Sequence, residues 1–185
     1  MRLQTLLIAA FTCFSSFLLR ADNGTDLRNR FEEIFDKYLD QTKYLNVEAK
    51  LGYKYLFIPL NLLEGMEFST TYSNFSDRET GLHLTATPKN KRIVVFNDEE
   101  WNLAKILYTI TAENSSAENQ VILHVIEKRF YEQPGWFTTT TTDQETSFSF
   151  TFSFNESVDL DLEQKPLFVK RKGVDTVKFA LRTPE

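Results

Sequence analysis

The stretch 147–154 reads SFSFTFSF and alternates strictly between hydroxyl and phenylalanine side chains. Successive side chains of a strand point to opposite faces, so Phe148, Phe150, Phe152 and Phe154 would share one face. Burying each of them is worth about 1.5–3 kcal/mol, and together they would form a larger apolar patch than a soluble monomer usually exposes. We therefore predict a strand whose Phe face is buried, either in the core or under a hydrophobic ligand or a protein partner. The Ser/Thr face is expected to point to solvent.

The same period of two recurs along the chain after residue 47. It predicts nine strands, separated by turn sequences such as PKN, NDEE and RKG, at 53–60, 66–72, 81–87, 91–96, 104–112, 120–127, 147–154, 166–171 and 174–181. Many short strands in succession favour an antiparallel all-β domain. We predict a mostly β protein, an antiparallel β-sandwich of the immunoglobulin or cadherin type, with a β-barrel as the alternative.

The segment 131–146, YEQPGWFTTTTTDQET, interrupts this pattern. Pro134-Gly135 predicts a turn. The run Thr138–Thr142 is either an exposed loop, which would be a candidate for O-glycosylation, or an extended edge strand, because Thr favours β structure. We place a soft boundary here, between a β-sandwich at 46–130 and C-terminal strands at 131–185 that belong to the same domain.

One helix is predicted, over residues 26–39, within an N-terminal segment at 22–45. Its apolar residues fall at helical spacing on one face and are Leu27, Phe31, Ile34, Phe35, Tyr38 and Leu39. Thr25 or Asp26 can cap its start. We expect this amphipathic helix to pack on a sheet, because its polar face lacks the basic residues that a membrane-surface helix carries.

The N-terminus begins with Arg2 and continues as a mostly apolar run to Leu19. This order is typical of a secretory signal peptide, predicted at 1–21, with an uncleaved anchor as the alternative. Cleavage would remove the only cysteine, Cys13, and the loss of Arg2 and Arg20 would take the net charge from −5 to −7. We thus expect a cysteine-free, acidic, secreted or surface-associated chain with no transmembrane segment beyond the signal. Its charge disfavours nucleic acid as a partner.

Four Asn-x-Ser/Thr sequons follow the predicted signal. They begin at Asn23, Asn74, Asn114 and Asn155, and each lies at a predicted loop or strand end. Such positions in an exported chain are acceptors for N-glycosylation, so these four residues are our candidate modification sites. The alternative is that some of them are simply turn-forming asparagines.

Residues that carry chemistry are sparse. His83 and His124 stand alone within strand patterns, without the spacing of a metal site, and we interpret them as structural. No nucleophile motif and no phosphate-binding glycine loop is present. Asp159, Asp161 and Glu163 would share one strand face, where they either bind calcium or, as we favour, form a solvated face. We accordingly predict no catalytic residue, no cofactor and no metal.

Residues 53–128 resemble the cadherin-like domains of the dystroglycan and sarcoglycan type. The similarity lies in YLFIPLNLLEGMEFSTTY, in LTATP and in KILYTITAENSSAENQVILHVIE, which resembles the closing hairpin of such domains. The proline-then-tryptophan core element of the family is missing from its expected place, since PGWF at 134–137 comes too late. The resemblance implies an extracellular immunoglobulin-like sandwich used in adhesion or receptor assembly, without enzymatic activity, and no site residue carries over.

Together these features predict a secreted or cell-surface glycoprotein that is not an enzyme and binds another extracellular protein. The first alternative is an extracellular carrier of a small apolar ligand. The second is a secreted hydrolase, for which convergent titratable groups would be needed.

Overall fold

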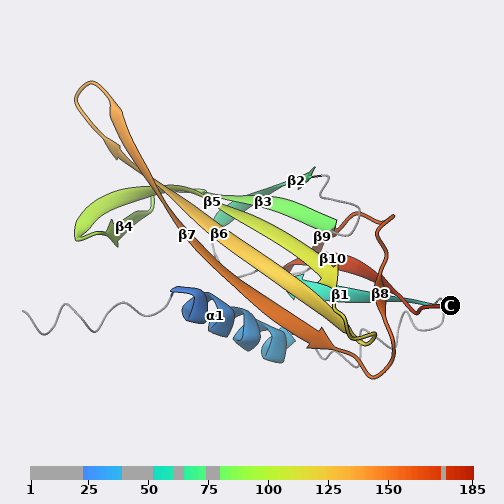
Figure 1. Ribbon diagram of the computed structural model, residues 1–185. Coiled ribbons are helices and arrows are strands. Elements are labelled where there is room, and N and C mark those ends of the chain that lie inside the picture. Colours follow the sequence, from blue (N-terminus) through green and yellow to red (C-terminus); the bar gives the residue numbers. More distant parts are fainter. Residues whose placement is uncertain (1–22, 39–51, 61–64, 74–79, 172–173) are drawn as a thin grey trace, which may run out of the picture.

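A computed structural model describes residues 23–38, 52–60, 65–73, 80–171 and 174–185 (Figure 1). The predicted signal peptide, Cys13 and Asn74 lie outside these residues. The chain forms one helix and ten strands: α1 Asn23–Tyr38, β1 Tyr53–Pro59, β2 Met66–Ser73, β3 Thr80–Pro88, β4 Ile93–Phe96, β5 Glu99–Asn114, β6 Gln120–Pro134, β7 Thr139–Ser153, β8 Asp159–Leu160, β9 Leu167–Arg171 and β10 Val174–Arg182. The prediction of a mostly β protein with antiparallel strands is confirmed.

The larger sheet has six strands in the order β2-β3-β5-β6-β7, with β4 paired to the outer part of β5. All of its pairings are antiparallel. Its longest members, β5, β6 and β7, form a twisted ribbon that runs the length of the molecule (Figure 1). Buried and less buried positions alternate along β5 and β6, which shows that one face of this sheet is the core face.

The smaller sheet contains β1, β10, β8 and β9. Strand β10 is its centre: β1 pairs along one edge, and β8 and β9 pair with the two ends of the other edge. Its inward residues join those of the larger sheet in one hydrophobic core, which includes Ile58, Phe179, Leu84 and Ile110. The described strands therefore form two open sheets that share a core, as in a sandwich, and not the barrel that was the alternative prediction.

Helix α1 covers the core face of β7 and also contacts β1 of the smaller sheet (Figure 1). Leu27 and Phe31 are fully buried in the core, as the predicted apolar face required. The Phe31 ring lies 5.3 Å from that of Phe148, and the Arg28 guanidinium lies 5.7 Å from the Phe150 ring. The Phe face of 147–154 is thus covered by the chain's own helix and core, with Phe152 buried and its three neighbours partly buried against the core.

Several details of the strands differ from the sequence prediction, and β5 begins at Glu99, within the predicted NDEE turn. The interruption predicted at 131–146 is mostly strand, since β6 continues to Pro134 and β7 begins at Thr139. The Thr run therefore adopts the edge-strand alternative, and only 135–138 form a turn. The short strand β8 was not predicted, because two residues are too few to show a period.

The described residues contain no helix with the length and apolar character needed to cross a membrane.

Candidate functional site

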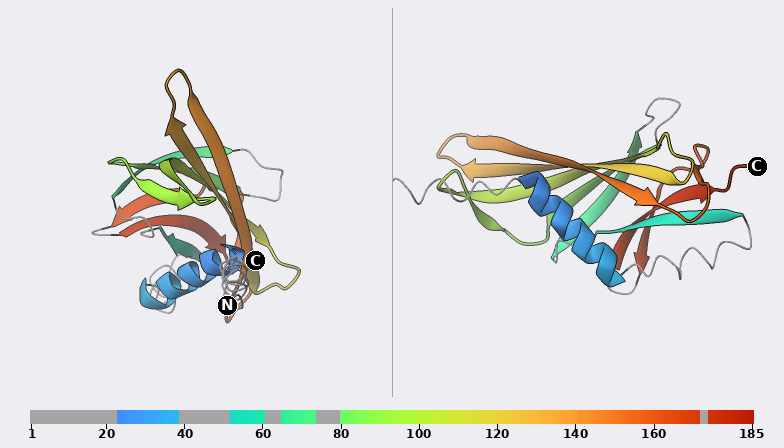
Figure 2. Two further views of the ribbon diagram at one scale, coloured as in Figure 1. Left: turned by 90° about the vertical axis from the view of Figure 1, so that its left-hand side faces the viewer. Right: turned by 60° about the horizontal axis from the view of Figure 1, so that its bottom comes forward.

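The β6–β7 hairpin extends beyond the rest of the larger sheet. Pairing between β5 and β6 ends at Asn102 and Glu132, whereas β6 and β7 stay paired as far as Pro134 and Thr139. We call the protruding part, residues 133–140, the arm. In two further views it stands clear of α1 and of the smaller sheet (Figure 2). The arm contains no charged residue.

The tip of the arm is a defined four-residue turn, Gly135–Thr138. The Gly135 amide donates a hydrogen bond to the Thr138 carbonyl oxygen at 2.9 Å, which closes the turn. A Cβ atom at position 135 would collide with that same oxygen, so the turn requires glycine there. The tip is therefore a turn specified by its sequence.

The tip presents two aromatic side chains to solvent. Trp136 is 99% exposed and Phe137 is 96% exposed, the two highest values among the exposed large hydrophobic residues. Each such side chain can bury about 150–250 Å² in a contact, and Trp is enriched among the residues that dominate interface energies. Two adjacent aromatic side chains that are fully exposed bury no area when the chain folds. The tip is therefore the strongest candidate for a binding surface.

Two of the predicted glycosylation sites, Asn114 and Asn155, lie at the opposite end of the sheet, whereas Asn23 is the first residue of α1 and not part of a loop. Asn114 ends β5 and Asn155 follows β7, and both are exposed. The Asn114 Oδ1 accepts a hydrogen bond from the Leu160 amide at 2.9 Å, which leaves its amide nitrogen for a glycan. At about 3.3 Å per residue, β6 separates this end from the tip by roughly 40 Å. Glycans at these two positions would leave the arm uncovered.

A second feature is a charge cluster made of the buried residues Tyr108 and Glu127 and the half-buried residues Arg30 and Arg129. The Glu127 carboxylate is only 3% exposed on the core face of β6. It accepts hydrogen bonds from the Tyr108 hydroxyl and the Arg129 Nε, both at 2.7 Å. Arg30 of α1 lies 3.9 Å from the same carboxylate. The cluster joins the helix to β5 and β6 of the larger sheet.

The pKa values of Tyr108 and Arg129 are both raised, away from neutral pH. Burial, and then the neighbouring Glu127 carboxylate, raise the pKa of Tyr108 well above its ordinary value. Burial alone would lower the pKa of Arg129, but its pairing with Glu127 leaves that pKa raised. A general acid or base works best with a pKa near the operating pH. The shifts therefore suit an ionic structural contact better than proton transfer.

The raised pKa of Tyr108 makes stability depend on alkaline pH. An unfolded tyrosine ionises near pH 10, whereas folded Tyr108 keeps its proton to higher pH. The unfolded state then binds fewer protons than the folded state, so the free energy of unfolding falls as the pH rises above about 10. Burial raises the pKa of Tyr131 in the same direction, whereas the lowered pKa of Lys54 acts in the opposite direction.

Urea denaturation from pH 9 to 11 measures this dependence, with Tyr108→Phe as the comparison. We expect the variant to lose stability less steeply with pH than the wild type. Equal slopes for the two proteins would contradict the raised pKa.

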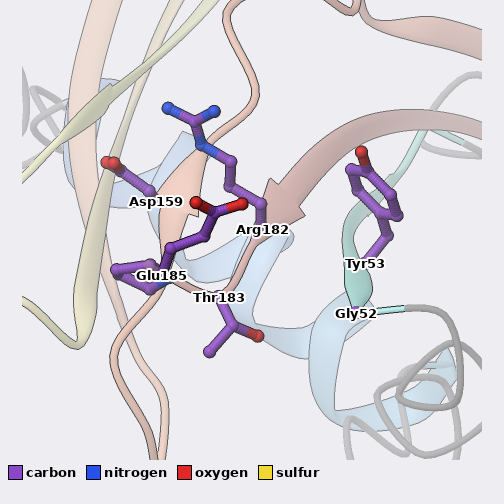
Figure 3. Close-up of a pocket in the computed structure, with 7 residues that line it drawn as sticks. Gly52, Tyr53, Asp159, Arg182, Thr183 and Glu185 are labelled. Carbon is purple, nitrogen blue, oxygen red and sulfur yellow. The ribbon is translucent and has the colours of Figure 1, made fainter.

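One pocket of about 540 Å³ lies at the other end of the molecule, beside the last residues of β10 (Figure 3). Arg182, Asp159 and Glu185 border it together with Tyr53 and Thr183. Figure 3 shows the guanidinium and both carboxylates at the same opening. A lining with this many charged and polar groups does not suit the apolar ligand of the predicted carrier alternative.

The two histidines interpreted as structural lie on the outer face of the larger sheet. The His124 Nδ1 is 2.7 Å from the Ser149 Oγ, and its Nε2 is 3.0 Å from the Glu113 Oε1. The His83 Nδ1 is 3.0 Å from the Thr109 Oγ1. The hydroxyl face of β7 was predicted to point to solvent, but Ser149 on this face also forms a hydrogen bond with His124 of the neighbouring strand β6.

The three carboxylates at 159–163 do not share a strand face, contrary to the prediction. Strand β8 ends at Leu160, and Asp161 is buried, with its Oδ1 accepting a hydrogen bond from the Glu163 amide at 3.1 Å. Glu163 itself is exposed. Within the described ranges, no group of three or more His, Cys, Asp or Glu side chains is placed to hold a metal ion. A tight turn after β8, rather than an extended strand, separates these side chains.

Sequence reasoning missed both the tip and the charge cluster, although each had a signal. Trp136 and Phe137 follow a Pro-Gly pair inside a polar stretch, where apolar residues have no predicted core face. The odd-numbered residues of β6 from Val121 to Val125 face the core. Extending this alternation to Glu127 and Arg129 places a charged pair on the same core-facing side of the strand.

No protein-family model, no curated protein and no solved structure matches this chain. The resemblance of residues 53–128 to cadherin-like domains accordingly stays a prediction.

Proposed function

We propose that this protein is a secreted or cell-surface glycoprotein that acts as a non-enzymatic binding module, and that the arm is its contact with a protein partner. The observation that carries the proposal is the nearly complete exposure of Trp136 and Phe137 at the end of a protruding hairpin. Aromatic residues of this kind anchor protein interfaces when they enter a pocket on the partner.

Three further features support this function. The hairpin is paired along its length and closed by a glycine turn, so the aromatic residues are held in place before binding, which lowers the entropic cost of association. The predicted glycosylation sites Asn114 and Asn155 lie at the far end of the sheet, which leaves the arm open to a large partner. The raised pKa values of Tyr108 and Arg129 favour a structural role for the charge cluster.

The test is binding of the purified glycosylated protein to intact cells of its source, with and without the two tip aromatics. Loss of binding in the Trp136→Ala/Phe137→Ala variant, with its fold retained, supports the proposal. Equal binding by both proteins, or no binding by the wild type at micromolar concentration, contradicts it.

A further inference from the structure

The surface at the root of the arm is acidic. Strands β4 and β5 are joined by a two-residue turn, Asn97-Asp98, in which both residues have positive φ, 52° and 63°. This is the backbone of a type I′ hairpin, for which Asn and Asp are well suited. The turn is followed by Glu99 and Glu100, and all three carboxylates are exposed.

This acidic turn is tied to the arm. The Gln133 Nε2 donates a hydrogen bond to the Glu100 carbonyl oxygen at 2.9 Å and lies 3.5 Å from the Glu99 Oε2. Gln133 is the first residue of the arm, adjacent to Pro134. The carboxylates of the β4–β5 turn are therefore placed at the base of the structure that carries Trp136 and Phe137.

Beyond Arg129 the hairpin adds negative charge and no positive charge. Residues 130–164 contain no Lys or Arg, while Glu132, Asp143 and Glu145 lie on the hairpin. Lys128 forms an ion pair with Asp143 at 2.9 Å. Arg92, which precedes β4, lies farther from the tip than the acidic turn does. Its amide donates a hydrogen bond to the Asn102 side chain, and Asn102 pairs with the end of β4 that is away from the turn.

We infer that the partner presents an apolar pocket edged by Lys or Arg side chains; this deepens the proposed function and rests on it. The aromatic tip fills the pocket, and the carboxylates of Asp98, Glu99 and Glu100 face the basic edge. Complementary charge of this kind speeds association and selects among partners, and it weakens as salt screens it. An anionic lipid surface would repel the same carboxylates, so the observations favour a protein over a membrane.

The first experiment neutralises the carboxylates of the acidic turn. We compare binding of the wild type, Asp98→Asn/Glu99→Gln/Glu100→Gln, and a control with the same charge change elsewhere, Glu33→Gln/Glu67→Gln/Glu163→Gln. The probe is the intact source cells, at 50 mM and 300 mM NaCl. We expect about tenfold weaker binding for the turn variant at low salt, a smaller difference at high salt, and less than about twofold change for the control.

The outcomes separate the two proposals. Unchanged binding by the turn variant, together with loss of binding by Trp136→Ala/Phe137→Ala, overturns the basic-edged pocket and leaves the proposed function standing. Unchanged binding by the variant without tip aromatics overturns the proposed function itself.

The second experiment tests directly whether the aromatic tip binds a lipid surface. Vesicles of phosphatidylcholine, and of phosphatidylcholine with one fifth phosphatidylserine, are mixed with the Trp101→Phe variant, in which Trp136 is the single tryptophan and is excited selectively over the tyrosines. We expect no shift of Trp136 emission and no co-sedimentation with either vesicle. A blue shift with either one identifies a membrane surface and overturns the inferred partner.

Discussion

Alanine at both Trp136 and Phe137 will weaken binding to the partner by at least about 100-fold and leave the stability of the protein unchanged. Anchor residues at an interface typically cost 2 kcal/mol or more each when truncated, and 1.4 kcal/mol corresponds to a tenfold change in affinity. The same side chains contribute nothing to the core, since they are 99% and 96% exposed. Cell-binding titration measures the first effect, and urea denaturation measures the second.

The matched control removes exposed apolar side chains elsewhere. Leu162, in the turn after β8, and Leu167, on β9, are 43% and 55% exposed, and their replacement by alanine removes apolar surface away from the tip and from the acidic turn. We expect binding of this Leu162→Ala/Leu167→Ala variant to stay within about threefold of the wild type, because its changes lie outside the anchor pocket. Equal losses in the two variants would show that general surface hydrophobicity, and not the arm, is responsible.

Glu127→Ala will lower the free energy of unfolding by about 1.5–3 kcal/mol, the range for hydrogen bonds to a charged group, because Arg30 and Arg129 are partly exposed and stay hydrated after the change. The Arg129 guanidinium would lose its 2.7 Å partner, and the Tyr108 hydroxyl would lose its buried acceptor. Arg30 of α1 would lose its nearest charge on the sheet, so the contact between helix and sheet would weaken as well. Urea denaturation of the intact secreted protein measures the change.

Two further variants show whether the lost charge pairing causes the loss of stability in Glu127→Ala. Glu67→Ala removes an exposed carboxylate from β2 and should change stability by no more than about 0.5 kcal/mol. Replacing the whole ionic set by Arg30→Leu/Glu127→Met/Arg129→Met should recover much of the loss, because no unpaired charge is left buried. A cost below about 1 kcal/mol for Glu127→Ala would contradict the cluster's role in holding the helix.

The strands could be predicted because burial on one face leaves a period of two in the sequence. Strands β1 to β7, β9 and β10 were found this way, and the Phe face of β7 was assigned to a buried surface. The apolar spacing of Leu27 and Phe31 likewise predicted a helix packed on a sheet. In each case the signal is local, because each element buries its own alternating or helical face.

The extent of the hairpin and its tip could not be predicted in the same way. Five threonines in a row carry no alternation, so the strand that the last four of them begin becomes evident only from its pairing with β6. The exposure of Trp136 depends on β5 ending its pairing at Asn102, some thirty residues away in the chain. The burial of Glu127 depends on partners supplied by β5 and α1. These features arise from tertiary contacts, which a single segment does not encode.

The solvent exposure of Trp136 in the free protein is the most direct test of an arm that presents an uncovered aromatic tip. The chain has two tryptophans, and Trp101 is buried while Trp136 is exposed, so the Trp101→Phe variant reports the tip alone. We expect emission and acrylamide quenching close to those of free tryptophan in water. A blue-shifted emission with weak quenching would show that the tip is already covered, and it would contradict an arm that is open for a partner.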